Sequence, residues 1–293
     1  SLADWLTQYY GESRITPREI FLGNGIRSLV WLTSLTFIDT GDPALLPGLG
    51  IPYYRKAVTA AGGIPVPYPL SIKNNWMPDF SKLSLRLRQA VRVCFVNYPH
   101  NPTGAELDEP TFQQLVERAS RENMLLVNDA CYHGIPSRKP LSIMAIDGGR
   151  KVGLELYSFS YLLGLSPIPF GFAVGHRHLI AALEAASQVL PPYIPKGFVD
   201  MAAQGLRQSP SKSLQGLRQQ FASTAVAARK MLETIGIESV SPPTVPFLWA
   251  RLPARRNSVT FARTMLKRYR ILIAPGTSFG EIGQGFVRVS LTV

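Results

Sequence analysis

The stretch VRVCFVNYPHNPTG occupies residues 91–104 and sets the pattern for most of the chain. Its first half, residues 91–97, is mostly apolar and rich in β-branched side chains, which is typical of a strand buried on both faces of a parallel sheet. Its second half is rich in Pro, Asn and Gly and predicts a loop at the carboxyl end of that strand. Ligands bind at this edge of open parallel sheets. The loop is therefore a candidate site, although such a loop taken alone is more often a plain turn.

The same order of strand, loop and helix repeats on both sides of this stretch. Apolar periodicity predicts helices over residues 26–38 and 109–123 and a strand over 124–128. This alternation favours a mostly parallel sheet covered by helices.

A different pattern begins near residue 210. A long helix is predicted over residues 213–235, and Gly236 ends it. A strand, a helix and a strand are then predicted over residues 247–252, 258–269 and 287–291. We therefore predict an α/β fold with a large domain over residues 1–210 and a smaller C-terminal α+β domain over residues 211–293.

Composition limits the classes of protein to consider. A chain of 293 residues with 46% hydrophobic content can bury a sizeable core. The longest apolar stretch, residues 162–175, is interrupted by two prolines and is shorter than the ~20 residues of a membrane span. With no secretory signal at the start and only Cys94 and Cys131 as cysteines, we expect a cytoplasmic protein with reduced thiols and no membrane contact.

The net charge of +12 is concentrated in the last third of the chain. Residues 201–293 contain thirteen Lys or Arg against three Asp or Glu, a net charge of +10. Binding of nucleic acid is one hypothesis, but the basic residues follow an amphipathic helix without a recognisable nucleic-acid motif. A solvated basic face that attracts anionic substrates is the preferred interpretation. No metal site is predicted, because His176 and His178 have no nearby carboxylate or thiol.

Two further motifs follow predicted strands. Residues 128–132 read NDACY and place an acid, Asp129, three residues before a phenol, Tyr132. Taken alone, Asp129 could cap a helix. Residues 158–160 read SFS and offer two hydroxyls suited to holding a phosphate.

Together, in this order and spacing, these motifs resemble the aminotransferases of class I/II that depend on pyridoxal 5'-phosphate (PLP). The likeness is greatest to the LL-diaminopimelate aminotransferase-like group. It implies the PLP-dependent transferase fold type I. The resemblance covers nearly the whole chain, through further matching stretches at residues 3–5 (ADW), 23–25 (GNG), 52–54 (PYY), 247–249 (FLW), 274–280 (APGTSFG) and 287–291 (VRVSL).

The resemblance also implies a role for each candidate site residue. Asp129 would pair with the ring nitrogen of the cofactor, and Asn101 and Tyr132 would hydrogen-bond its 3'-oxygen. Arg288 would bind the α-carboxylate of the substrate through its planar fork. The cofactor phosphate would lie at a helix N-terminus and near two hydroxyls. These phosphate-binding residues are Gly25, Ile26, Arg27, Ser158 and Ser160.

Three positions depart from the family pattern. Tyr161 stands where the family has the lysine that binds the cofactor covalently, Pro169 where it has a phosphate-binding arginine, and Ile51 where it has a stacking aromatic ring. Tyr161, with a reference pKa of ~10, would be a poor base at neutral pH. The pattern further expects an N-terminal segment that closes over the substrate and a helix after residues 287–291, and neither is visible.

These departures leave it open whether the protein is an enzyme. The main hypothesis is a pseudoenzyme or binding protein that keeps the aminotransferase fold without ordinary transamination. The alternative is an enzyme that uses PLP or pyridoxamine phosphate (PMP) non-covalently on an amino-acid-like carboxylate, with Tyr161 or His133 as acid or base. The resemblance also implies a homodimer, because sites in this family are built across a dimer interface. A basic nucleic-acid-binding protein is the disfavoured third hypothesis.

Overall fold

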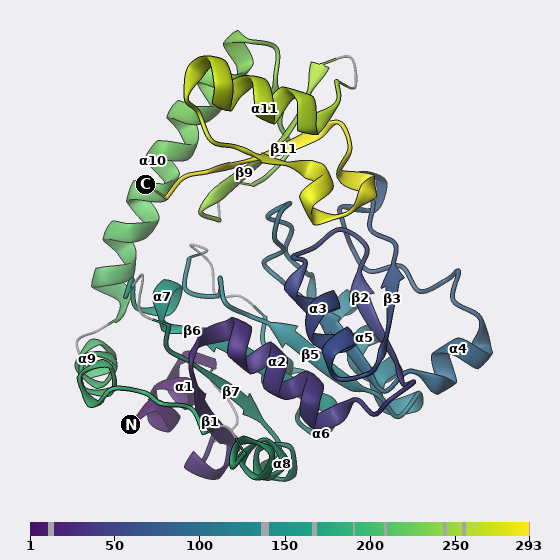
Figure 1. Ribbon diagram of the computed structural model, residues 1–293. Coiled ribbons are helices and arrows are strands. Elements are labelled where there is room, and N and C mark those ends of the chain that lie inside the picture. The colour runs from purple at the N-terminus through teal and green to yellow at the C-terminus, as the bar shows by residue number, and fades with distance from the viewer. Residues whose placement is uncertain are drawn as a thin grey trace.

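Two sheets organise the chain. The computed structural model describes residues 1–10, 15–135, 141–165, 169–189, 191–207, 210–242, 245–253 and 256–292. A seven-stranded sheet lies in the lower part of Figure 1, and a four-stranded sheet lies in the upper, green-to-yellow part. The predicted α/β class is confirmed.

The large sheet has the order β1-β7-β6-β5-β4-β2-β3. Strand β7 runs antiparallel to both neighbours, and the other pairs are parallel, so the sheet is mixed but mostly parallel, as predicted. Its strands are β1 (Ile20–Gly23), β2 (Pro43–Pro47), β3 (Ile64–Tyr68), β4 (Val93–Val96), β5 (Leu125–Asp129), β6 (Gly153–Ser158) and β7 (Gly171–Gly175).

Helices cover both faces of this sheet. Side chains alternate between the faces along each strand. Val93 and Phe95 therefore pack with α2 (Gly25–Phe37), α3 (Tyr53–Ala60) and α8 (Arg177–Ser187). Cys94 and Val96 pack on the other face, with α1 (Leu2–Tyr10) and α5 (Glu109–Arg121). A strand that is buried on both faces needs consecutive apolar residues, and residues 93–96 (VCFV) supply them.

Capping residues explain why two predicted helices begin where they do. Oδ1 of Asp108 accepts a hydrogen bond from the Thr111 amide at 2.9 Å at the start of α5. Asn257 accepts one from the Thr260 amide at 2.9 Å at the start of α11 (Ser258–Tyr269). Both helices match the predicted ranges to within two residues.

The small sheet is antiparallel and has the order β10-β11-β9-β8. Its strands are β8 (Glu238–Ser239), β9 (Phe247–Arg251), β10 (Ala274–Pro275) and β11 (Phe286–Ser290), and it lies beside α10 (Pro210–Thr234) and α11. The change from parallel to antiparallel structure falls where the sequence pattern changes. The division into two domains at residues 210 and 211 stays a prediction.

The remaining elements are short or connect the two sheets. They are α4 (Leu85–Ala90), α6 (Gly149–Val152), α7 (Phe159–Leu162), α9 (Lys196–Arg207), and the 3₁₀ helices η1 (Pro17–Glu19), η2 (Ile72–Asn74), η3 (Ile143–Ala145), η5 (Gly276–Phe279) and η6 (Glu281–Gly283). Within the described ranges, no helix combines the length and the apolar character that crossing a membrane requires.

Candidate functional site

The predicted site residues come together at one edge of the large sheet. The parallel strands β2, β4, β5 and β6 all end at this edge, and β1 ends there too because it is antiparallel to β7. Gly23 and Ser158 both pair with Gly171, which places the start of α2 beside the start of α7. The three sequence motifs therefore face a common region, as their strand-end positions indicate.

Asp129 is fully buried at the end of β5, with 0% of its surface exposed. Its Oδ2 accepts hydrogen bonds from the hydroxyls of Tyr53 at 2.5 Å and Tyr54 at 2.6 Å. Its Oδ1 accepts one from the Cys131 amide at 3.2 Å. Burial raises the pKa of Asp129, and the hydrogen bonds from the two tyrosines lower it in part.

Asn97 fixes the geometry of the two loops on either side of this acid. Its side-chain amide donates to the Asp129 carbonyl at 2.7 Å, and its oxygen accepts from the Asn101 amide at 2.9 Å. Because Asn97 is buried, these contacts satisfy backbone groups that water cannot reach. The end of β4 is thereby tied to the end of β5.

Asn101 connects the large sheet to the small one. Its Nδ2 donates to the Tyr132 hydroxyl at 2.7 Å, and its Oδ1 accepts from Nη1 of Arg288 at 3.0 Å. Arg288 lies on β11, so this contact joins residues that are 187 positions apart. Three predicted residues thus form one hydrogen-bonded chain.

The guanidinium of Arg288 is held between aromatic rings. It lies 5.3 Å from the ring centroid of Phe247 and 4.9 Å from that of Phe279. Burial lowers the pKa of Arg288, while the neighbouring phenols Tyr132 and Tyr161 raise it. Its Nε is buried and has no hydrogen-bond partner within the described part of the chain.

The start of α2 is closely packed around Gly25. This residue has φ +78°, and a Cβ there would lie 3.3 Å from the carbonyl carbon of Pro169. The site therefore needs a glycine for both conformation and space. Ile26 is half-buried, and Arg27 is exposed. At the start of the neighbouring α7, the hydroxyl of the N-cap residue Ser158 accepts a hydrogen bond from the Ser160 amide at 3.2 Å.

Tyr161 lies on α7 with its ring centroid 4.9 Å from that of Tyr132. Burial raises the pKa of Tyr161, the nearby Cys131 raises it further, and Arg288 lowers it. Its phenol therefore keeps its proton at neutral pH and can donate it.

Tyr53 and Tyr54 are the residues to which sequence reasoning assigned no role. They are the first two residues of α3 and belong to the PYY stretch, which was the available signal. His133 was named as an acid or base, but its Nε2 donates to the Tyr98 carbonyl at 3.1 Å and its ring lies 5.6 Å from Tyr157. Tyr157 packs in the core on the face of the sheet that α5 covers.

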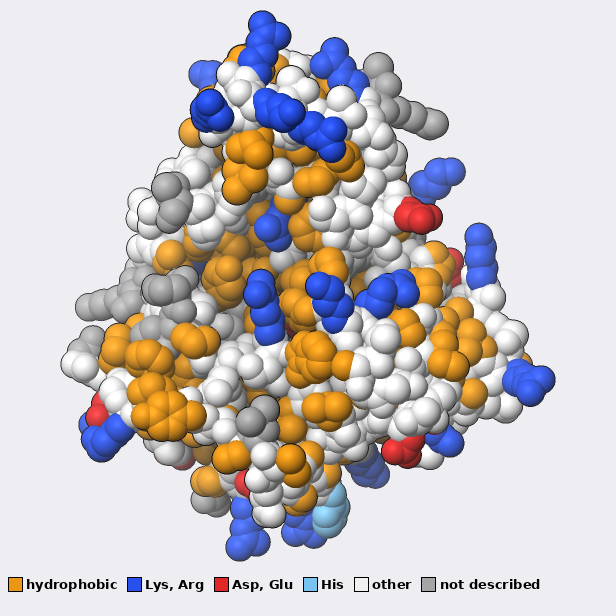
Figure 2. Space-filling view, in the orientation of Figure 1, with side chains coloured by type: hydrophobic (Ala, Val, Ile, Leu, Met, Phe, Trp, Pro, Cys, Tyr) orange, Lys and Arg blue, Asp and Glu red, His pale blue; other side chains and the backbone are white. Residues whose placement is uncertain are grey.

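Figure 2 shows where charge and apolar surface lie around this region. On the face drawn, Lys and Arg side chains lie over the upper part and across the middle, with hydrophobic side chains between them. Within the described chain, no three His, Cys, Asp or Glu side chains are grouped so as to hold a metal ion. With Arg288 between the rings of Phe247 and Phe279, the site is basic and aromatic apart from the buried acid.

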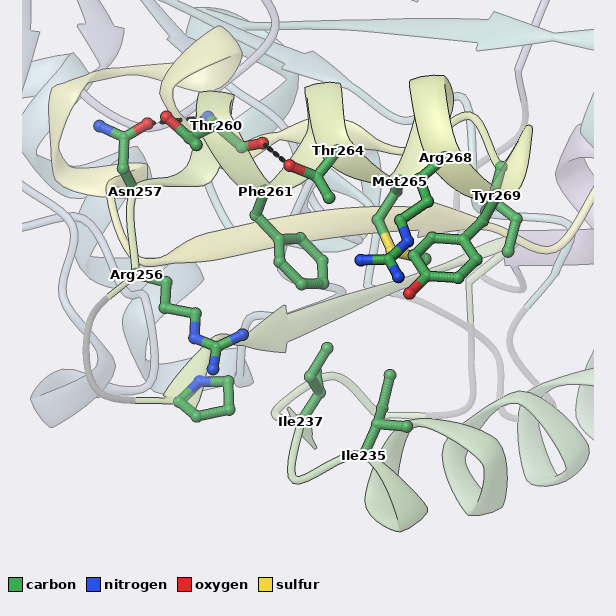
Figure 3. Close-up of a pocket in the computed structure, with 12 residues that line it drawn as sticks. Ile235, Ile237, Arg256, Asn257, Thr260, Phe261, Thr264, Met265, Arg268 and Tyr269 are labelled. Atoms are coloured by element: carbon green, nitrogen blue, oxygen red, sulfur yellow. Dashed lines mark hydrogen bonds between the residues drawn. The ribbon is translucent and has the colours of Figure 1, made fainter.

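A separate groove lies along α11. Figure 3 shows Phe261, Met265 and Tyr269 on one side and Ile235 and Ile237 on the other. The residues that line it all come from positions 235–271, so none of them belongs to the large sheet. The groove is apolar with arginines at its rim, and it does not include the Asp129 cluster.

His100 lies in the same loop as Asn101, and its burial makes the stability of the folded protein depend on pH. Its Nε2 donates to the Leu49 carbonyl at 2.9 Å, and its Nδ1 accepts from the Thr103 hydroxyl at 2.7 Å. Burial lowers its pKa from 6.5 to about 4. As pH falls from 6.5 to 4, the unfolded chain takes up a proton that the folded protein does not, so stability falls.

Urea unfolding measures the free energy of unfolding of wild type and of His100→Gln at pH 7.5 and at pH 4. We expect the value for wild type, relative to that for His100→Gln, to fall by about 2–4 kcal/mol between these two pH values. The matched control is Thr103→Val, which removes the hydroxyl partner but keeps the imidazole. It should lower stability at each pH and retain the pH dependence. A constant difference between wild type and His100→Gln would contradict a neutral, buried His100.

Comparison with known proteins places this arrangement in a family. The sequence profile of the aminotransferases of class I and II matches residues 1–293. The LL-diaminopimelate aminotransferase of Desulforudis audaxviator is 30% identical over 299 residues, which cover 100% of this chain and 75% of the relative. The LL-diaminopimelate aminotransferase of Halothermothrix orenii is 28% identical over 295 residues, covering 100% and 76%.

Solved structures agree on the fold. Substrate-bound BacF from Bacillus subtilis has a TM-score of 0.94 at 27% identity and covers 100% of this chain and 75% of its own. A probable N-succinyldiaminopimelate aminotransferase from Thermus thermophilus has a TM-score of 0.92 at 26% identity, covering 100% and 78%. The predicted fold type I is therefore confirmed.

The hypothesis of a pseudoenzyme or binding protein is contradicted. Relatives that match the full length of this chain are named as LL-diaminopimelate aminotransferases, which points to a working aminotransferase. The family's lysine, arginine and stacking ring are replaced, but other polar residues of the site are kept and lie together. These residues are Asp129, Asn101, Tyr132 and Arg288. With its fold, its strand-end cluster and its full-length sequence match, the chain belongs to the aminotransferase class I and II family.

Proposed function

We propose that this protein is an aminotransferase-type enzyme that holds PLP or PMP non-covalently and acts on an amino-acid-like carboxylate substrate. The observation that carries the proposal is the hydrogen-bonded chain from Arg288 through Asn101 to Tyr132, beside the buried Asp129. A carboxylate-binding group and a ring-binding acid are thereby brought into one cluster from two different sheets.

The chemistry of the donor set fits a pyridoxal-type cofactor. Asp129 offers a buried carboxylate for a ring nitrogen, and Asn101 and Tyr132 offer an amide and a phenol for the 3'-oxygen. The tight, positive-φ start of α2 at Gly25 suits a phosphate, because backbone N–H groups at a helix N-terminus attract anions. Ile26, Arg27, Ser158 and Ser160 would complete this phosphate site.

When bound, the cofactor supplies an electron sink for the pair released at the α-carbon of the substrate. Arg288 would bind the carboxylate of that substrate, and its unpartnered Nε favours this role because a planar fork can donate two parallel hydrogen bonds. The rings of Phe247 and Phe279 orient the guanidinium and exclude water from it.

Tyr161 would serve as a proton donor beside the substrate. Its raised pKa keeps the phenol protonated at neutral pH, which suits an acid better than a base. Tyr161 would take the position of the family's covalent lysine, because it follows Ser158 at the end of β6 and Ser160 on α7. A phenol forms no covalent link to the cofactor, so the binding energy comes from the ring and phosphate contacts.

Assembly as a homodimer and a cytoplasmic location stay predictions that rest on the family resemblance and on composition. Nucleic acid stays a disfavoured partner.

A single-turnover experiment tests the proposed function. Protein loaded with PMP should convert a 2-oxo acid into the corresponding amino acid, which mass spectrometry detects. Arg288→Lys should raise the 2-oxo acid concentration for half-maximal rate at least about tenfold, since a lysine cannot donate two parallel hydrogen bonds to a carboxylate.

The matched control is Arg251→Lys, because Arg251 lies on the same small sheet but is exposed and paired with Glu238 at 3.4 Å. Its rate should equal that of wild type. Bound PMP without any amino acid formed, or equal losses in both variants, would contradict the proposal.

Tyr161→Lys tests the non-covalent mode. Wild type loaded with PLP and treated with borohydride should keep its unmodified mass, whereas Tyr161→Lys should gain one cofactor per chain, because its amine can condense with the aldehyde. Intact-protein mass spectrometry measures both. A wild type that gains this mass would show a covalent anchor elsewhere in the chain and would refute the non-covalent assignment.

A further inference from the structure

The carboxylate of Asp129 is already supplied with donors by the protein itself. An ionised carboxylate offers about four lone-pair sites. Tyr53, Tyr54 and the Cys131 amide each donate to it, and the two phenols share one oxygen, Oδ2. A ring N–H that binds Oδ2 must therefore compete with these phenols.

The two tyrosines share one acceptor oxygen but lie in different surroundings. Tyr54 is 2% exposed and packs inside the core, with its ring centroid 5.7 Å from that of Phe95. Tyr53 is half-buried and packs only at the margin of that core. Tyr53 is thus the donor that can move toward solvent, whereas Tyr54 is fixed behind the acid.

The amide of Cys131 is also a poor candidate for displacement. Cys131 is buried, and its amide belongs to the backbone directly after β5. Moving it would disturb Tyr132, whose hydroxyl is tied to Asn101 at 2.7 Å. Of the donors around Asp129, the hydroxyl of Tyr53 is the one that a ligand can replace with the least rearrangement.

We propose that Tyr53 is a positioning residue that holds Asp129 in the absence of cofactor and yields its place to the ring nitrogen when PLP or PMP binds. This inference rests on the proposed function, since it presupposes that a pyridoxal-type cofactor binds. One donor, the phenol O–H of Tyr53, is exchanged for another, the ring N–H, and the carboxylate keeps its charge.

The exchange has a physical rationale. A buried carboxylate without donors is costly, and its pKa rises until it takes up a proton. Tyr53 supplies a donor that stays protonated, because burial and the neighbouring Asp129 raise its pKa well above 10.0. The empty site therefore keeps an acceptor ready for the cofactor, but each binding event must break the bond between Tyr53 and Asp129.

Calorimetric titration with PMP tests this role. Tyr53→Phe removes only the hydroxyl that competes for Oδ2, so its dissociation constant for PMP should be about tenfold lower than that of wild type. Tyr54→Phe is the matched control, since it removes a hydroxyl from the same oxygen but on the core side. It should bind PMP no more tightly than wild type.

A second probe separates this role from a general change in the pocket. A PMP analogue with carbon in place of the ring nitrogen has no N–H to offer Asp129, so Tyr53→Phe should not tighten its binding. Circular dichroism checks that each variant is folded before titration.

The possible outcomes differ in meaning. PMP binding that is equally tight in wild type and Tyr53→Phe, or a gain shared by Tyr54→Phe or by the carbon analogue, would overturn the role of Tyr53 and leave the proposed function standing. Absence of PMP binding in all three folded proteins would overturn the proposed function itself, and the role of Tyr53 with it.

Discussion

The buried carboxylate of Asp129 is the group around which the candidate site is organised. A charge at 0% exposure is tolerated only when hydrogen-bond donors surround it. The chain supplies them from the start of α3 and from the backbone directly after β5, and the Asn97 side chain at the end of β4 binds the backbone of Asp129. The start of α3 and the ends of β4 and β5 are thus held together around one acid.

The second constraint is the contact between the two sheets. Arg288 on β11 reaches Asn101 at the edge of the large sheet, and apolar side chains pack around this contact from both parts. Cys131, Tyr132 and Tyr161 share this cluster with Phe247 and Leu291. Asp129 and Arg288, for which we propose cofactor and substrate binding, are therefore positioned by one continuous set of contacts.

Much of this arrangement could be predicted from the sequence. Apolar runs and capping residues located β4, β5, α5 and α11 to within two residues, and strand-end motifs indicated that Asn101, Asp129 and Tyr132 lie together. The side-chain directions at the start of α3 could not be predicted, because a phenol in the first turn of a helix can face either the core or the site. Tyr54 packs in the core, whereas the adjacent Tyr53 lies at its margin beside the site. The direction of the His133 side chain was equally uncertain, and it faces the core.

The departures at Ile51, Tyr161 and Pro169 led to the wrong expectation of a pseudoenzyme. The loss of the family's lysine, arginine and stacking ring does not determine whether the other hydrogen-bonding residues of the site are kept. We propose that these residues hold a cofactor without a covalent anchor. The decisive measurement is a crystal structure of the protein soaked with PMP. We expect the ring nitrogen at hydrogen-bond distance from Asp129, with the Tyr53 hydroxyl displaced and no bond to Tyr161. A ligand bound elsewhere, or an intact contact between Tyr53 and Asp129 beneath a bound ring, would contradict it.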